Sequence, residues 1–255
     1  MTSHLVIPDP HAHPDHSNER FSYLGNLVAD LKPDAVICIG DWADMPSLCS
    51  YEKGTKGFEG RRYKKDIEAA LDAQEKFLGP LRKRKKKFPK FYMLVGNHEH
   101  RINRAINQDA AQLDGLISLA DLQFAHYGWE VVDYAGGTPG ILELDGIAYA
   151  HYHCSGAMGR AVSGEHPAYQ LIHKGLTSCT QGHIHTTDYC VRTNKLGTSV
   201  HGLVAGCYLD YFADYAGVFN ALWWRGVVFK KDVENGRYDP EWISLERIKK
   251  AYGVV

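Results

Sequence analysis

The sequence lacks the long apolar runs of membrane-spanning proteins and the large excess of basic residues that many nucleic-acid-binding proteins carry. Its longest apolar runs, such as Ala35–Ile39, are far shorter than the ~20 residues that a membrane-spanning helix needs. The 29 basic and 30 acidic residues leave a net charge of −1, so no overall field draws the chain toward nucleic acid or lipid. We therefore expect no membrane partner.

Closely paired cysteines are also missing. None of the six cysteines belongs to a C-x-x-C pair, and scattered cysteines favour reduced thiols over a disulfide framework. The residues that follow Met1 show neither the basic nor the apolar segment of a secretion signal. We therefore expect a protein of the cytoplasm.

What the chain does contain is typical of a globular protein. Hydrophobic residues make up 44% of it and charged residues 23%, which excludes wholesale disorder and a coiled coil. No low-complexity linker divides the chain, so we expect residues 1–255 to form a single domain. The chain also has 14 histidines, several of them grouped in short motifs.

The first half of the chain alternates between strand and helix patterns. A helix is expected after Ser17, with apolar residues at helical spacing from Phe21 to Leu31, and a second helix at Arg61–Lys87, with a break at Gly79–Pro80. Such alternation favours parallel strands with right-handed crossovers. The predicted strands are His4–Pro8, Ala35–Ile39 and Phe91–Val95.

The second half reads as short strands joined by tight turns. Asp145-Gly146 and Asn194–Gly197 are typical hairpin turns, so we expect a mainly antiparallel sheet. The two halves together predict an α/β sandwich of two sheets with helices outside. The predicted strands are Trp129–Asp133, Ile141–Leu144, Ile147–Tyr152, Thr187–Thr193, Thr198–Ala205 and Ala221–Lys230.

Polar residues that suit metal ions follow several of these strands. Asp9 and His11 follow the first strand, Asp41 the second, and Asn97 with His98 the third. The carboxyl ends of parallel strands form the crevice where open α/β sheets bind ligands. Carboxylate, amide and imidazole groups gathered there predict a metal site.

Further histidines follow the later strands. His151 ends one predicted strand, and His153 is an alternative ligand two residues on. In the sequence Gly182-His183-Ile184-His185, strand alternation would place His183 and His185 on one face. These imidazoles are expected to converge on the same metal site.

The series D-x-H, G-D, G-N-H-E, H and G-H-x-H, which runs from Asp9 to His185, resembles the calcineurin-like metallophosphoesterase superfamily. The resemblance implies a four-layer α/β/β/α sandwich of two mixed sheets flanked by helices, with two divalent metal ions. One ion would be held by Asp9, His11 and His185, and the other by Asn97, His151 and His183, while Asp41 would bridge both. Manganese is the metal we expect, and iron, zinc or nickel would also suit this mixed ligand set.

The resemblance also implies a reaction, the hydrolysis of phosphate mono- or diesters by a metal-bound hydroxide. His98, which is not a ligand in this scheme, would assist the leaving oxygen, and Asp44 of the G-D-x-x-D pattern would orient it. Small or nucleotide-type esters are the expected substrates, with nucleic acid as an alternative. The oligomeric state stays open.

Three other functions are less compatible with the sequence. In the protein-phosphatase branch the G-D-x-x-D pattern continues with Arg-Gly, whereas Met45-Pro46 follows here, which disfavours that branch. The near-zero net charge disfavours a DNA or RNA nuclease. The complete ligand set, together with His98, disfavours a non-catalytic metal-binding scaffold.

Substrate contacts are expected from residues around the metal site. The long segments Trp42–Arg62 and Cys154–Ala168 leave strand ends and should form its rim. Their cations suit an anion. The basic run Arg82–Lys87 is expected at the opposite end of the sheet. The residues expected at the phosphate are Arg160, Arg101 and Asn97, and aromatic residues from Tyr208 to Tyr215 would either pack internally or stack on a base.

Overall fold

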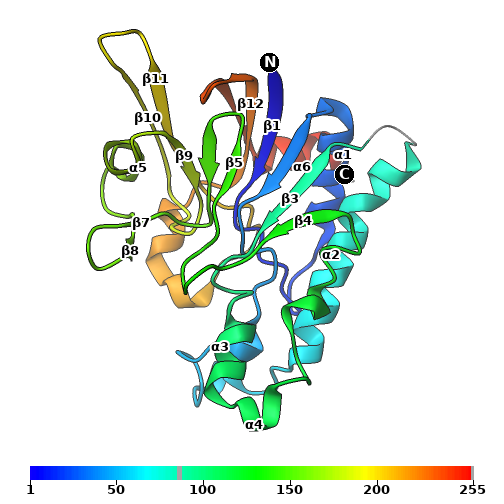
Figure 1. The fold of residues 1–255 in the computed structure, drawn as a ribbon. Coiled ribbons are helices and arrows are strands. Elements are labelled where there is room, and N and C mark those ends of the chain that lie inside the picture. The colour runs from blue at the N-terminus through cyan, green and yellow to red at the C-terminus, as the bar shows by residue number, and fades with distance from the viewer. Residues whose placement is uncertain (85–87, 254–255) are drawn as a thin grey trace.

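The first sheet of the protein has six strands in the order β13-β12-β1-β2-β3-β4 (Figure 1). This computed structural model describes residues 1–84 and 88–253, and every element named below lies within them. The outer pair, β12 and β13, is antiparallel, and β12 runs antiparallel to β1. The remaining four strands run parallel, as expected for strand–helix alternation. The bounds are β1 (Thr2–Ile7), β2 (Ala35–Cys38), β3 (Lys90–Leu94), β4 (Trp129–Val132), β12 (Gly226–Glu234) and β13 (Arg237–Ser244).

Three strands of this sheet differ from the sequence prediction. We expected the strand at Trp129–Asp133 in the antiparallel half, but β4 pairs parallel with β3. The chain between them is long enough for a crossover, and it forms α3 (Arg101–Gln108), α4 (Ala110–Leu113) and a 3₁₀ turn at Leu119–Leu122.

The strand expected at Ala221–Lys230 was also placed in the antiparallel half, but β12 begins at Gly226 and joins the first sheet beside β1. No strand was predicted after Lys230, whereas β13 forms the edge of this sheet, a position that tolerates its Pro240.

The second sheet has five strands in the order β10-β11-β9-β6-β5. Its two hairpins, β5–β6 and β10–β11, turn where the sequence predicted, at Asp145-Gly146 and Asn194–Gly197. β9 runs parallel to both of its neighbours, so this sheet is also mixed. The bounds are β5 (Leu142–Leu144), β6 (Ile147–Tyr149), β9 (Ser178–Gln181), β10 (Thr187–Thr193) and β11 (Ser199–Ala205), and a separate hairpin consists of β7 (Cys154–Ser155) and β8 (Arg160–Ala161).

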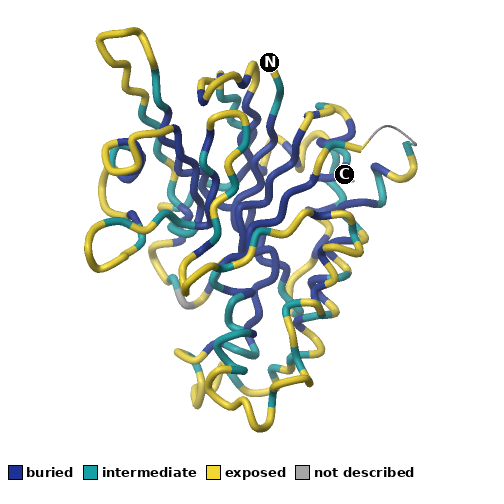
Figure 2. Tube along the Cα trace, viewed as in Figure 1, coloured by how far each residue is buried: buried dark blue, intermediate teal, exposed yellow. Residues whose placement is uncertain are grey.

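The sheets and helices form the four layers that the sequence predicted. Side chains alternate along β1, so Val6 packs against the second sheet while Leu5 and Ile7 pack against the helices. Helices α1 (Glu19–Leu31), α2 (Tyr63–Lys83) and α6 (Leu245–Tyr252) cover the first sheet, and α5 (Pro167–Gly175) covers the second. Figure 2 shows the buried strands of both sheets at the centre of the molecule.

Helix α2 is continuous at Gly79–Pro80, where we expected a break. It includes Pro80 and continues to Lys83. The last turns of α2 pack against α1, where the carbonyl of Phe77 lies against Gly25. Residues 85–87 of the basic run lie outside the described residues. Among the described helices, none is long and apolar enough to cross a membrane.

Candidate metal centre

The seven predicted ligands come from five strand ends in both sheets. Asp9 and His11 follow β1, Asp41 follows β2, and Asn97 follows β3 in the first sheet. The second sheet adds His151 after β6, and His183 and His185 after β9. All are buried except Asn97 and His183, which are partly exposed. The two sheets therefore meet at a polar, largely enclosed cluster.

One half of the cluster consists of Asp9, His11 and His185. The two imidazole Nε2 atoms lie 3.3 Å apart, and Nε2 of His185 lies 3.7 Å from Oδ1 of Asp9. Their candidate ligand atoms all fall within 4.8 Å of one another. Nδ1 of His11 lies 2.7 Å from Oδ1 of Asp44, a contact in which the ring donates its proton and leaves Nε2 free for a metal.

The other half of the cluster is arranged around Nε2 of His151. This atom lies 2.8 Å from Oδ1 of Asn97 and 3.2 Å from Nδ1 of His183. The other ring nitrogen of His151, Nδ1, lies 3.0 Å from the carbonyl oxygen of Ile39, to which it can donate a hydrogen bond. His153 is directed elsewhere, because its Nε2 lies 3.3 Å from the carbonyl oxygen of Thr180 on β9.

Asp41 lies between the two halves. Its Oδ2 is 3.7 Å from Nε2 of His11 and 3.4 Å from Nε2 of His151. Its other oxygen, Oδ1, accepts a hydrogen bond of 2.9 Å from the backbone N–H of His98. The carboxylate is thereby held with one oxygen facing both groups of imidazoles.

The backbone of the cluster is unusual, because five of the seven residues have positive φ angles. These angles range from 40° at Asp9 to 69° at His183, and non-glycine residues adopt them rarely. The expectation that His183 and His185 sit on one face of an extended strand is therefore wrong. They lie in a turn after β9, and one faces His151 while the other faces His11.

Two glycines allow the backbone to approach the carboxylates. A Cβ atom at Gly182 would collide with Oδ2 of Asp9, and a Cβ atom at Gly96 would collide with Oδ1 of Asp41. Gly182 brings the backbone N–H of His183 to within 3.0 Å of both oxygens of Asp9. Any side chain at either glycine would displace a predicted ligand.

The electrostatics of the cluster fit divalent cations. Burial and the nearby Asp41 carboxylate raise the pKa of Asp9 well above its usual value, and burial lowers the pKa of His151 to about 3. Imidazole nitrogens 3.2–3.3 Å apart leave room for one proton at most, whereas a cation can accept both lone pairs. Oxygen and nitrogen donors without thiolates suit manganese, iron, zinc or nickel.

His98 lies beside the cluster with Asp44 and Arg101. Its Nδ1 is 2.7 Å from the carbonyl oxygen of Asp44 and 3.0 Å from Oδ1 of the same residue. Arg101 approaches the opposite ring atom, with Nη2 at 3.1 Å from Nε2. Burial alone lowers the pKa of His98, but the carboxylates of Asp41 and Asp44 outweigh it and leave the pKa above its usual value.

A sequence comparison decides the family. The model of the calcineurin-like phosphoesterase family matches residues 3–189, well over half of the chain. The chain belongs to the calcineurin-like phosphoesterase family. It is also similar to the gene 54 protein of Mycobacterium phage L5, with 27% identity over 195 residues that cover 72% of this chain and 70% of that protein.

Two solved structures are also similar to this chain. One is a predicted phosphoesterase from Streptococcus pneumoniae TIGR4, with 12% identity and a TM-score of 0.37 over 96% of this chain and 90% of that one. The other is the nuclease MPE of Pseudomonas putida, with 14% identity and a TM-score of 0.39 over 93% and 87% of the two chains.

The structure adds two supporting residues, Glu99 and Arg20, that the sequence did not single out. Glu99 is fully buried, and its carboxylate accepts hydrogen bonds of 2.7–3.0 Å from the backbone N–H groups of Asp41, Ala43 and Gly96. Burial and the Asp41 carboxylate raise the pKa of Glu99 to about 7. In the sequence, the only indication of this role was that Glu99 is the glutamate that ends the G-N-H-E motif.

Arg20 supports the loop that carries His11. It is fully buried in α1, and its Nη2 donates to the carbonyl oxygens of Pro10 at 2.6 Å and His11 at 2.9 Å. Its Nη1 lies 3.2 Å from Oδ1 of Asp210. A single arginine in an amphipathic helix gives no sequence signal for this role.

Only parts of the two predicted rim segments, Trp42–Arg62 and Cys154–Ala168, lie beside the cluster. Trp42 is buried in the core against Phe21, but later residues of its segment, including Arg61, line a cavity of about 400 Å³ together with Asp44. This segment includes 3₁₀ turns at Pro46–Leu48 and Lys56–Phe58. Arg160 lies exposed in the β7–β8 hairpin, whereas Arg101 contacts His98 directly.

Proposed function

We propose that this chain is a dinuclear metal-dependent phosphoesterase that hydrolyses phosphate mono- or diesters of small or nucleotide-type compounds. The observation that carries the proposal is the position of Asp41, whose Oδ2 lies within 3.7 Å of an imidazole nitrogen from each half of the cluster. A carboxylate in this position suits a pair of cations better than a single one. Two divalent ions in such a site lower the pKa of water and offset the charge on phosphoryl oxygens.

The residues divide into two ligand sets around Asp41. Asp9, His11 and His185 are assigned to one ion, and Asn97, His151 and His183 to the other, with Asp41 shared. Asn97 contributes a neutral oxygen, which limits the negative charge at a site that must also attract an anionic phosphate. Asp44 and the carbonyl oxygen of Ile39 hold the rings of His11 and His151 so that each Nε2 faces the cluster.

His98 and Arg101 act on the leaving side of the ester. Nε2 of His98 lies 3.8 Å from Oδ2 of Asp41, so the imidazole is beside the shared carboxylate. Asp44 positions the ring through Nδ1, and the raised pKa of His98 favours the protonated form that assists a departing oxygen. The Arg101 guanidinium can donate to Nε2 only while that nitrogen carries no proton, so it would turn to the phosphoryl oxygens when His98 is protonated.

The test is activity and metal content measured on the same samples. Protein reconstituted separately with manganese, iron, zinc or nickel is assayed on p-nitrophenyl phosphate and bis-p-nitrophenyl phosphate. We expect hydrolysis, two ions per chain, and loss of both in Asp41→Ala. Glu68→Ala, which changes an exposed carboxylate on α2, is the matched control and keeps both. Two bound ions with no hydrolysis of any ester would favour a scaffold and overturn the proposal.

A further inference from the structure

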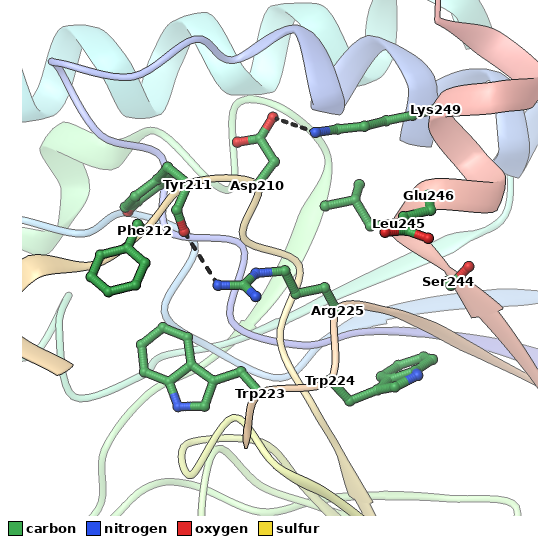
Figure 3. A pocket seen from close by; sticks show the side chains of 10 residues that line it. All are labelled: Asp210, Tyr211, Phe212, Trp223, Trp224, Arg225, Ser244, Leu245, Glu246 and Lys249. Carbon is green, nitrogen blue, oxygen red and sulfur yellow. Dashed lines mark hydrogen bonds and ion pairs between the residues drawn. The ribbon is translucent and has the colours of Figure 1, made fainter. Parts of the chain in front are cut away.

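A second cavity, of about 520 Å³, is lined by the side chains that Figure 3 shows. It lies between the loop after β11, the start of β12 and the start of α6, and Phe212, Trp223 and Arg225 are among its lining residues. Its size is that of a pocket for a small organic group. The metal cluster itself does not use these side chains, so the cavity calls for a separate explanation.

The wall of this cavity touches the metal centre. The Trp223 ring meets the His185 imidazole edge to face, with 4.3 Å between ring centroids and 83° between planes. The backbone N–H of Trp224 donates to the carbonyl oxygen of His185 at 3.1 Å. On the other side, the Tyr211 hydroxyl donates to the carbonyl oxygen of His11 at 3.2 Å. A group in the cavity is therefore one side chain away from His185, one of the residues expected to hold a metal ion.

Phe212 and Trp223 form an aromatic surface on one side of the cavity. Phe212 is 60% exposed and Trp223 is partly exposed, so both rings can contact a ligand. Figure 3 shows the Arg225 side chain extending toward this side, and its guanidinium carbon lies 5.8 Å from the Trp223 ring centroid. Aromatic rings with an adjacent guanidinium form a surface on which flat, polar ring systems stack.

Arg225 also has hydrogen-bonding capacity to spare. Its guanidinium donates to neutral oxygens at 3.4–3.5 Å, namely the carbonyls of Tyr211 and Asn220 and the Asn220 side chain. Within residues 1–84 and 88–253, no carboxylate forms an ion pair with it, whereas Lys249 of the same cavity pairs with Asp210 at 3.5 Å. Glu246 lies on the α6 side, across the cavity from Phe212 (Figure 3). The guanidinium can therefore donate to acceptor atoms of a ligand.

We propose that this cavity binds the base of a nucleotide ester whose phosphate lies at the metal centre. The base stacks on Phe212 and Trp223, and Arg225 donates hydrogen bonds to its ring nitrogen or carbonyl acceptors. An aliphatic chain would leave the guanidinium without acceptors, and an inorganic anion would leave the rings unused. This inference rests on the proposed phosphoesterase function and names the substrate class for it.

The experiment compares esters that differ only in the nucleoside or the base. The diester pair is thymidine 5′-(p-nitrophenyl phosphate) and methyl p-nitrophenyl phosphate, which share the scissile bond and the leaving group. The monoester pair is adenosine 5′-monophosphate and ribose 5-phosphate. We expect the protein to favour the nucleoside-bearing member of the pair that it cleaves, chiefly through a lower KM. Because stacking on an aromatic side chain stabilises a bound base strongly, Phe212→Ala and Arg225→Gln should each reduce this preference by roughly tenfold.

Phe219→Ala is the matched control. Phe219 is 64% exposed on the 3₁₀ segment Asp214–Leu222 but does not line the cavity, so its loss should leave the preference unchanged. Equal preference in the wild-type protein and Phe212→Ala would overturn the assignment of the base, and so would a wild-type protein without any preference.

A second measurement separates this inference from the proposed function. Adenosine and thymidine, which carry no phosphate, are titrated into metal-free protein, and binding is followed by tryptophan fluorescence, to which Trp223 and Trp224 contribute. Binding that Phe212→Ala weakens and Phe219→Ala does not weaken supports the base site even if no ester is hydrolysed. Hydrolysis of generic esters without nucleoside binding would retain the phosphoesterase and reject the base site.

Discussion

Asp44 holds the ring of His11 through a 2.7 Å contact between Oδ1 and Nδ1. The same carboxylate oxygen lies 3.0 Å from Nδ1 of His98, so one side chain orients both a proposed metal ligand and the proposed acid. Asp44 is itself held inside the protein, with a side chain that is 12% exposed. Its removal should therefore disturb metal binding as well as catalysis.

Asp44→Ala tests this double role. Because a residue that orients a ligating imidazole typically contributes 10–100-fold to metal affinity, we expect a loss of roughly that size together with a lower kcat. Calorimetric metal titration and steady-state kinetics measure the two effects separately. Asp44→Asn, which keeps a hydrogen-bond acceptor, should recover part of the metal affinity. Unchanged metal affinity in Asp44→Ala would mean that His11 does not depend on Asp44.

His98→Ala separates chemistry from metal binding. We expect both ions to remain and kcat to fall by roughly 10²–10⁴-fold, the usual contribution of a positioned acid. The loss should shrink for p-nitrophenyl esters, whose leaving group needs little protonation. Ligand atoms of His98, His11 and Asp41 lie within 4.8 Å of one another, so a variant that loses one ion would reassign His98 as a ligand.

Arg101→Ala and Arg160→Ala compare the two arginines expected at the phosphate. Arg101 is 3.1 Å from Nε2 of His98, whereas Arg160 is exposed in the β7–β8 hairpin. A lost charge-assisted contact typically costs about 1.5–3 kcal/mol. Arg101→Ala should therefore reduce kcat/KM by roughly ten- to a hundredfold at constant metal content, and Arg160→Ala by less. The opposite ranking in steady-state kinetics would place the phosphate nearer the hairpin.

Lys230 should make the stability of the protein depend on pH. It is fully buried between the sheets, and its Nζ donates to the Thr180 hydroxyl at 2.6 Å and lies 4.1 Å from the Tyr238 ring centroid. Burial lowers the pKa of Lys230 well below its usual value and raises that of Tyr149 and Tyr238, which stay protonated. The folded state therefore binds fewer protons than the unfolded state between the lowered pKa and about 10.4.

The free energy of unfolding should accordingly rise with pH across that window, by up to about 1.4 kcal/mol per pH unit from this group. Urea unfolding between pH 7 and 10 measures the slope, and Lys230→Met should flatten it. Lys64→Met, at an 87% exposed lysine on α2, is the control and should leave the slope as it is. The same slope in Lys230→Met as in the wild-type protein would contradict a neutral, buried amine.

The gathering of several proposed ligands at one edge of the first sheet was predictable from the order of residues alone. Asp9, Asp41 and Asn97 each follow a strand of one parallel sheet, and the carboxyl ends of parallel strands must lie at the same edge. The motifs that contain these residues also indicated the family, which the match over residues 3–189 confirms. Local sequence was sufficient here because strand direction and sheet order follow from the alternation of strands and helices.

Other features depended on contacts between distant parts of the chain. The positive φ angles of His183 and His185 break the strand alternation that we expected, and they turn the two imidazoles toward different partners. The Trp223–His185 contact joins the cavity lined by Phe212 and Arg225 to the candidate metal centre, and it brings together segments that are far apart in the chain. Such contacts have no local signal, because packing between the two sheets, rather than the preference of any single segment, determines which side chains meet.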